Sequence, residues 1–111
     1  MGMVKENIQR FEVWLVRLDP VQGSEIKKTC LCVILSPDEI SALKTAIIAP
    51  MTSKGFQFPT RIPCTFQEKK GLILLDHMRS VDKSRFIKKL GIISKNAQMK
   101  TISCLQELFA L

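Results

Sequence analysis

A carboxylate, an imidazole and a guanidinium lie close together in the sequence, at Asp76, His77 and Arg79. A histidine is suited to general base chemistry, because its reference pKa of about 6.5 lies near neutral pH. An arginine can bind phosphate through paired N–H donors, although this one can also pair with Asp76 or Asp82. For Asp76 we favour a structural role over catalysis, since it follows a buried apolar strand and can cap the next loop.

The four cysteines, Cys30, Cys32, Cys64 and Cys104, do not form a metal-binding pattern. There is no Cys-x-x-Cys pair and no histidine at ligand spacing, so we expect no metal and no cofactor. Cys30 and Cys32 would share one strand face at a Cα spacing of about 6.5 Å, which strains a disulfide. We expect Cys32, Cys64 and Cys104 to be buried small hydrophobic residues.

Positive charge is concentrated in the second half of the chain. The formal net charge is +7. The segment 69–100 accounts for all of it, with basic residues at Lys69, Lys70, Arg79, Lys83, Arg85, Lys88, Lys89, Lys95 and Lys100. Such an excess is typical of a protein whose partner carries phosphates, and the alternative is a solvated basic face without a ligand.

The length of 111 residues predicts one domain, spanning 1–111. No run approaches the about 18 apolar residues that cross a bilayer, and the N-terminus lacks the apolar centre of a signal peptide. We therefore expect a cytoplasmic protein without membrane contact.

The chemistry-bearing residues must be positioned mainly by strands. Short runs rich in β-formers occur at 11–17, 29–35, 45–49, 60–66, 72–75 and 90–93. Turn signals separate them, polar loops occupy 21–28 and 51–59, and 83–89 is either helical or extended. The pattern predicts a mainly β fold, a small barrel or strongly bent sheet of five or six strands, with Trp14 in its core.

A helix is expected to end the chain. Ser94 is a suitable N-cap. The residues Ala97, Ile102, Leu105, Leu108 and Phe109 recur at spacings that place most of them on one face. Pro63 within 60–66 indicates an edge strand or a bulge, because proline cannot donate to a sheet.

Four segments together resemble the MazF/PemK (Kid) toxins of type II toxin–antitoxin systems. They are EVWLVRLDP at 12–20 leading to GSE at 23–25, VILSP at 33–37, APMT at 49–52, and LLDHMRSVDKSR at 74–85. The resemblance covers nearly all of the chain between Arg10 and Ile93, and the order of the four segments makes it specific.

The resemblance implies an SH3-like barrel with a C-terminal helix that forms a symmetric homodimer in the bacterial cytoplasm. A groove at the dimer interface would take single-stranded RNA or mRNA, and the acidic C-terminal tail of a partner antitoxin would block it. The implied activity is that of a metal-independent, sequence-specific endoribonuclease. In that reaction the ribose 2′-hydroxyl attacks the adjacent phosphate, which requires a base, an acid and a donor for the transition-state charge.

Catalytic residues transfer from the family only in part. Thr52 matches a threonine at the scissile phosphate, whereas Cys30 stands where many members carry an arginine. Three interpretations remain open: Lys27, Lys28 or Arg79 replaces that cation, the chain is a degenerate binding member, or it is a tolerated disabled variant. Losing one such donor typically costs about a hundredfold to a thousandfold in rate.

The resemblance also indicates RNA contacts in the loops. Asp76 falls on an aspartate that the Kid-like branch uses, but Leu74 replaces the accompanying arginine. For His77 we favour a polar contact to RNA over catalysis. The candidate RNA-binding residues are Ser24, Glu25, Lys27, Lys28, Ser53, Lys54, His77 and Arg79. Phe56 and Phe58 could stack on bases or anchor their loop to the barrel.

Two other function classes compete with the ribonuclease. The cysteine at position 30 favours a catalytically inactive module that binds RNA or antitoxin. A gyrase poison like CcdB would share the fold without cutting RNA, but Thr52 and the Gly23-Ser24-Glu25 loop favour the ribonuclease lineage.

Overall fold

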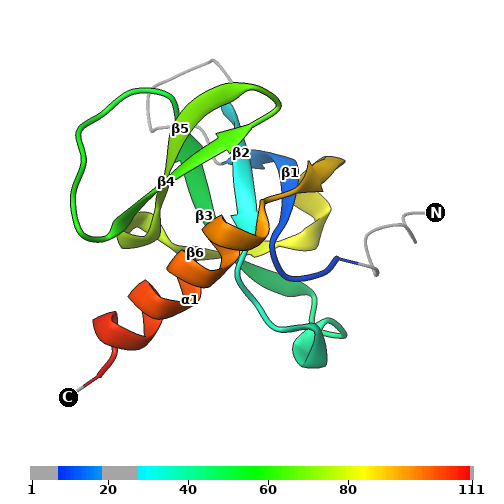
Figure 1. Cartoon of the computed structure of the whole chain (residues 1–111). Coiled ribbons are helices and arrows are strands. Elements are labelled where there is room, and N and C mark those ends of the chain that lie inside the picture. The colour runs from blue at the N-terminus through cyan, green and yellow to red at the C-terminus, as the bar shows by residue number, and fades with distance from the viewer. Residues whose placement is uncertain (1–7, 19–27, 111) are drawn as a thin grey trace, which may run out of the picture.

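The computed structural model describes residues 8–18 and 28–110 and shows a bent β-sheet with one α-helix beside it (Figure 1). The strands in the described part of the chain are β1 (Glu12–Leu18), β2 (Lys28–Ile34), β3 (Thr45–Thr52), β4 (Arg61–Phe66), β5 (Lys69–Leu74), β6 (Arg79–Asp82) and β7 (Phe86–Ile92). The helix α1 spans Lys95–Leu108, and short 3-10 turns lie at Asp38–Ile40, Leu75–His77 and Lys83–Arg85.

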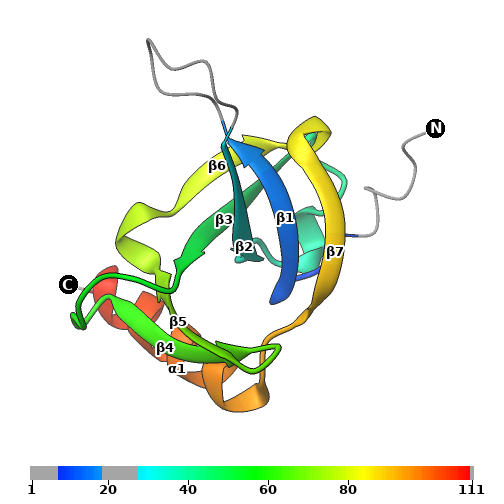
Figure 2. The ribbon, with the colours of Figure 1, turned by 90° about the horizontal axis from the view of Figure 1, so that it is seen from above.

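All strand pairs are antiparallel, in the order β4-β5-β3-β2-β1-β7, with β6 paired to β3 beyond the end of β5. The sheet curls until the β4–β5 hairpin faces the curved β6-β3-β2-β1-β7 part (Figure 2). The expected mainly β fold with a C-terminal helix is therefore confirmed. The sheet remains open, because no backbone pairing joins β4 to β7 in the residues that the structure describes.

The sheet has seven strands rather than five or six. The additional strand is β6, which the sequence places in a loop because only one of its four residues, Val81, is buried. The 83–89 segment is extended for the most part and begins with a single 3-10 turn. Pro63 does lie on an edge strand, since within the described residues β4 pairs only with β5.

Two apolar clusters fix the central strands from both faces. Neighbouring residues of a strand point to opposite faces, and Val13, Val33 and Ala49 lie in one cluster whereas Trp14, Cys32 and Ile48 lie in the other. The first cluster also takes in β4, β5 and α1. β2 and β3 are therefore buried on both sides, which makes them a rigid base for the residues at their ends.

Trp14 lies in the core as expected, 4% exposed, and it takes part in a buried polar network. Its Nε1 donates to Glu12 Oε1 at 2.9 Å, and its ring meets the ring of Phe86 edge-on at 5.5 Å. The Lys89 ammonium lies 3.0 Å from the other Glu12 oxygen. A carboxylate that is 3% exposed is tolerated here because its oxygens are both paired.

The helix α1 begins as predicted, with Ser94 Oγ accepting from the backbone N–H of Ala97 at 3.2 Å. Ala97 is buried, whereas Leu108 and Phe109, toward the C-terminal end of the helix, are exposed. The last turn of the helix extends beyond the sheet, as Figure 1 shows, and has no strand to pack on. No helix in the described residues has the length and apolar character needed to span a membrane.

All four cysteines are free thiols. Cys32 and Cys64 are buried as predicted, and Cys104 is only half-buried, with Sγ 3.4 Å from the carbonyl oxygen of Pro59. Burial raises the pKa of the Cys32 thiol to about 12 and also raises the pKa of Cys64. Both thiols are therefore protonated at neutral pH and are poor nucleophiles.

Candidate functional site

A groove of about 440 Å³ opens between the β2 and β3 ends on one side and the β4–β5 hairpin on the other. Its floor is apolar, with Leu31, Met51, Cys64 and Phe66 among the lining residues. Its polar lining residues are Thr29, Cys30, Thr52, Ser53, Gln67, Lys69 and Lys70. An apolar floor with a few polar groups is the usual form of a ligand site.

The structure brings together Cys30 and Thr52, the two positions that the family resemblance assigns to the scissile phosphate. Cys32 pairs with Pro50 across β2 and β3, and continuing this register by two residues sets Cys30 opposite Thr52. Both residues line the groove and both are partly buried. The backbone N–H of Lys54 donates to Thr52 Oγ1 at 3.1 Å, which orients that hydroxyl oxygen while its proton can still be donated to a ligand.

Close packing of β5 against Thr52 shapes this end of the groove. Thr52 pairs with Leu72, and the neighbouring residue Gly71 lies so near that a Cβ built on it would be 2.8 Å from the Thr52 carbonyl oxygen. A glycine is therefore required at position 71 for steric reasons. The sequence alone does not reveal this requirement.

Asp76 is not among the groove-lining residues. It lies in the 3-10 turn after β5, where Thr60 Oγ1 donates to it at 3.1 Å and Arg61 Nη2 donates at 3.3 Å. Hydrogen bonding to Arg61 is the main reason that the pKa of Asp76 falls below its ordinary value. These contacts match the structural alternative, because Asp76 ties the start of β4 to the end of β5.

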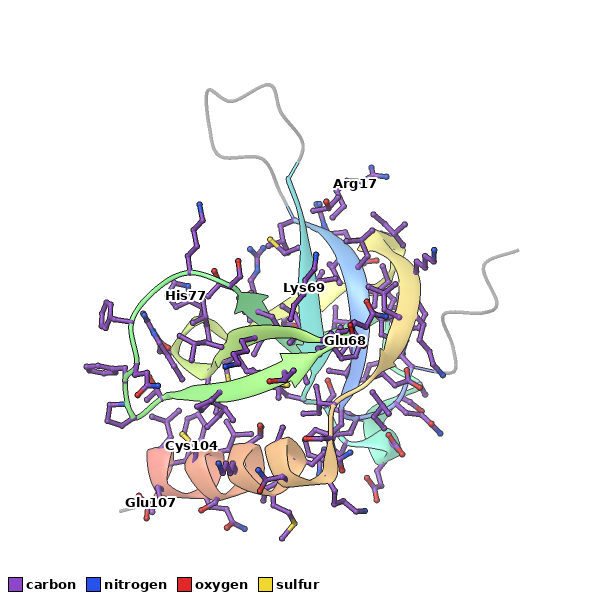
Figure 3. All side chains as sticks on the ribbon, turned by 45° about the horizontal axis from the view of Figure 1, so that its top comes forward. Arg17, Glu68, Lys69, His77, Cys104 and Glu107 are labelled. Atoms are coloured by element: carbon purple, nitrogen blue, oxygen red, sulfur yellow. The ribbon has the colours of Figure 1, made fainter. Side chains whose placement is uncertain are left out.

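His77 and Arg79 also lie away from the groove lining. His77 is more than half exposed, with Nε2 3.4 Å from Asp76 Oδ2, and in Figure 3 it lies beside the 53–60 loop, apart from Lys69. Arg79 begins β6 opposite Ile48, near enough to Cys32 for its charge to lower the pKa of that thiol against the larger effect of burial. Neither side chain lines the groove, although Arg79 lies on the same face of the sheet as Ile48 and Cys32.

The candidate RNA-binding residues in the loops differ in how they lie relative to the groove. Ser53 lines it, and Lys54 is exposed beside it. Lys28 begins β2, next to the lining residue Thr29, and only its backbone is described. Ser24, Glu25 and Lys27 lie outside the described residues.

Phe56 and Phe58 do not anchor their loop in the core, since they are 64% and 55% exposed. Their rings meet edge-on at 6.1 Å, and the Arg61 guanidinium lies 4.7 Å from the centre of the Phe56 ring. A shallow depression over Ser53, Gly55, Gln57 and Lys70 joins this loop to the groove. The exposure favours the base-stacking alternative, because an aromatic platform beside a basic groove is typical of single-strand binding.

Lys69 and Lys70 line the groove, and sequence reasoning missed them as site residues. The sequence places them in a charged hairpin turn within the basic segment. Recognising the tight turn could have identified them. The turn pairs Phe66 with Lys69 and Thr65 with Lys70, and this register fixes the direction of each side chain.

Within the described residues, no three histidine, cysteine, aspartate or glutamate side chains are grouped so that they could hold a metal ion. The chemistry available in the groove consists of hydroxyl, thiol, amide and ammonium groups. Such a set can bind a phosphate and donate hydrogen bonds to it.

Comparisons with known proteins agree with this fold. The family model of the PemK-like, MazF-like toxin of type II toxin–antitoxin systems matches residues 9–109. The endoribonuclease MazF of Staphylococcus epidermidis is 29% identical over 105 residues, which cover 88% of each chain.

Solved structures show the same arrangement. MazF from Deinococcus radiodurans has a TM-score of 0.76 at 20% identity, covering 94% of this chain and 97% of its own. MazF in a MazE–MazF complex from the same organism has a TM-score of 0.77 at 21% identity, covering 91% and 94%. The Mycobacterium tuberculosis toxin MazF-mt6 has a TM-score of 0.72 at 14% identity, covering 88% and 95%. The chain therefore belongs to the PemK-like, MazF-like family of type II toxin–antitoxin toxins.

Proposed function

We propose that this chain is the toxin component of a type II toxin–antitoxin system, an endoribonuclease that cuts single-stranded RNA in the groove between β2, β3 and the β4–β5 hairpin. The observation that carries the proposal is the juxtaposition of Thr52 and Cys30, the two family positions at the scissile phosphate, in one groove with basic side chains. The 29% identity to an endoribonuclease supports the same activity.

The proposed reaction needs no metal ion. The 2′-hydroxyl oxygen attacks the adjacent phosphorus, the bond from phosphorus to the 5′ oxygen breaks, and a 2′,3′-cyclic phosphate and a 5′-hydroxyl result. The 2′-hydroxyl proton passes to solvent water and solvent water supplies one proton to the 5′ oxygen, so that the protons balance. Thr52 would donate its hydroxyl proton in a hydrogen bond to a non-bridging phosphate oxygen, from a position that Lys54 and Gly71 hold.

Cys30 makes the proposed enzyme weaker than one with an arginine in its place. A thiol is a weak donor and carries no positive charge when protonated, whereas a guanidinium offers five N–H donors in a planar fork. The same feature favours a second candidate function, a catalytically inactive module that binds RNA or antitoxin.

The charge of the chain supports the proposed partners. A net charge of +7 suits both single-stranded RNA and an antitoxin with an acidic C-terminal tail, since each would bring negative charge to the groove. Complexes of MazE with MazF among the similar structures support the antitoxin partner. We further propose that the chain works as a homodimer in the bacterial cytoplasm, and that the loops around the groove set the RNA sequence that is cut.

The test is cleavage of a long, weakly structured RNA in EDTA, mapped by primer extension, with the unmodified chain and its Thr52→Ala and Cys30→Arg variants. We expect discrete cuts by the unmodified chain, far fewer with Thr52→Ala and faster cutting with Cys30→Arg. Cuts that persist unchanged in Thr52→Ala would overturn the assignment of this groove. Absence of cutting by both the unmodified chain and Cys30→Arg would favour the binding module.

A further inference from the structure

Building on the ribonuclease function proposed above, we propose that Lys69 supplies the positive charge that Cys30 cannot offer to the scissile phosphate. The groove has its two family positions on the β2–β3 side and its cations on the β4–β5 side. Lys69 and Lys70 are the charged residues among the described ones that line it, and no carboxylate in that set offsets them. Among these lining residues, the positive charge therefore lies on the side of the groove opposite Cys30 and Thr52.

The hairpin holds Lys69 firmly although its side chain is exposed. Gln67 and Glu68 have φ angles of 51° and 68°, which is the pattern of a tight two-residue turn. Phe66 pairs with Lys69 directly after that turn. Gln67 Nε2 also donates to the carbonyl oxygen of Leu90 at 3.4 Å, so the hairpin tip is tied to β7.

The alternation of β5 directs Lys69 toward the groove. Lys69, Gly71 and Ile73 share one face, and Ile73 lies fully buried in the inner core cluster. Lys69 thus continues the inner face at the open end of the sheet, where Figure 3 shows it between the hairpin and β2.

The distance to Thr52 is set by Gly71. A Cβ built at position 71 would be 2.8 Å from the Thr52 carbonyl oxygen. Lys69 lies two residues before Gly71 on the same face of β5, so it is about 6.6 Å along the strand from that contact. A lysine side chain can cover this span, because its flexible four-carbon stem carries the ammonium group well beyond Cβ. Thr52 pairs with Leu72, so its own side chain lies on the other face from Lys69, and the ammonium would reach it at the open end of the groove past Gly71, which has no side chain in the way.

The apolar floor makes this charge effective. Leu31 and Phe66 line the groove, and so does Cys64, whose thiol is neutral because burial raises its pKa. Displacing water over such a floor lowers the local dielectric constant, and the attraction between an ammonium and a phosphate rises accordingly. The cation would stabilise the two negative non-bridging oxygens at the pentacoordinate stage without taking part in the proton transfers.

Four single variants test this, each compared with the unmodified chain on an oligonucleotide containing one mapped cut site. Lys69→Ala should lower kcat about a hundredfold, the usual cost of one transition-state donor, with a much smaller change in KM. Lys69→Arg should retain most of the activity. Lys70→Ala, on the adjacent face of the same hairpin, should mainly raise KM. Lys88→Ala removes the same charge from exposed β7 and should change neither.

The possible outcomes distinguish a failure of the Lys69 proposal from a failure of the proposed ribonuclease function. If the unmodified chain cuts RNA and the Lys69→Ala variant has an unchanged kcat, whether or not its KM rises, then Lys69 is not the cation. The ribonuclease function would stand in that case. Absence of cutting by the unmodified chain with cutting by Cys30→Arg would also overturn the inference, because no replacement cation would then be present. Absence of cutting by both would overturn the ribonuclease function itself. Thermal melting of each variant shows that an activity loss is not a folding loss.

Discussion

Replacing Gly71 by alanine should damage both the stability of the fold and the activity of the groove. The new Cβ would be 2.8 Å from the Thr52 carbonyl oxygen, about 0.6 Å inside an ordinary contact of 3.4 Å. The obstacle is backbone of β3 and not the end of a flexible side chain, so the strands themselves must separate. This separation falls at the short β3–β5 pairing of Met51 with Ile73 and Thr52 with Leu72.

The expected magnitude follows from overpacking. Inserting one methyl group into a packed site costs roughly 1–3 kcal/mol, which lowers Tm by about 5–15 °C for a domain of this size. A displacement of 1 Å at a reacting group can cost about a hundredfold in rate, so about half that shift at Thr52 should cost about tenfold. Tm would be measured by circular dichroism and kcat on the single-site oligonucleotide.

Gly55→Ala provides the matched control. Its Cβ would lie 3.8 Å from Arg61 Nη1 and 4.0 Å from Thr52 Cγ2, which are ordinary contacts, so any loss there comes from its φ of 111° and not from a clash with the site. Unchanged Tm and unchanged kcat in Gly71→Ala would refute the claim that Gly71 sets the position of Thr52.

Three further variants test other parts of the account. Phe56→Ala should weaken binding of a non-cleavable 2′-methoxy RNA by about 1–3 kcal/mol in fluorescence anisotropy, since one base would lose its stacking surface; unaltered affinity would favour another role for this ring. Asp76→Asn should lower Tm at pH 7, because the ionised carboxylate pairs with Arg61 there. The difference in Tm from the unmodified chain should disappear as the pH falls below about 4 and through the lowered pKa of Asp76. A difference that persists at pH 2 would contradict the ion-pair explanation. Glu12→Ala should cost about 2–4 kcal/mol in urea unfolding because the Trp14 indole N–H loses its acceptor, and a loss below about 0.5 kcal/mol would show that the network is dispensable.

The sequence predicts the elements well where a strand or helix carries its own signal. Alternation and β-branched residues locate β1, β2 and β3, and Ser94 marks the first turn of α1. β6 escapes detection because its exposed face leaves Val81 as its single buried residue, and it forms through pairing with distant β3. Leu108 and Phe109 follow the helical period, but whether an apolar residue is buried depends on the extent of the neighbouring sheet.

The residues of the candidate site also differ in whether the sequence alone predicts them. Thr52 and Cys30 can be assigned from the family pattern, and their approach follows from the pairing of β2 with β3. Lys69 is recognisable only once the hairpin turn and the curl of the sheet bring β5 over β2, because these contacts are long-range. For Asp76 the sequence favours a structural role, but it does not indicate the partner Arg61, which lies fifteen residues earlier.

The most direct test of the proposed reaction uses two oligoribonucleotides that contain the mapped cut site, identical except for one 2′-deoxynucleotide on the 5′ side of that site, incubated with the unmodified chain in EDTA. Mass spectrometry of the products should show a 2′,3′-cyclic phosphate and a 5′-hydroxyl from the all-ribose strand and no cleavage of the substituted strand. Cleavage of the 2′-deoxy strand, or a requirement for added divalent metal, would contradict metal-free attack by the ribose hydroxyl in this groove.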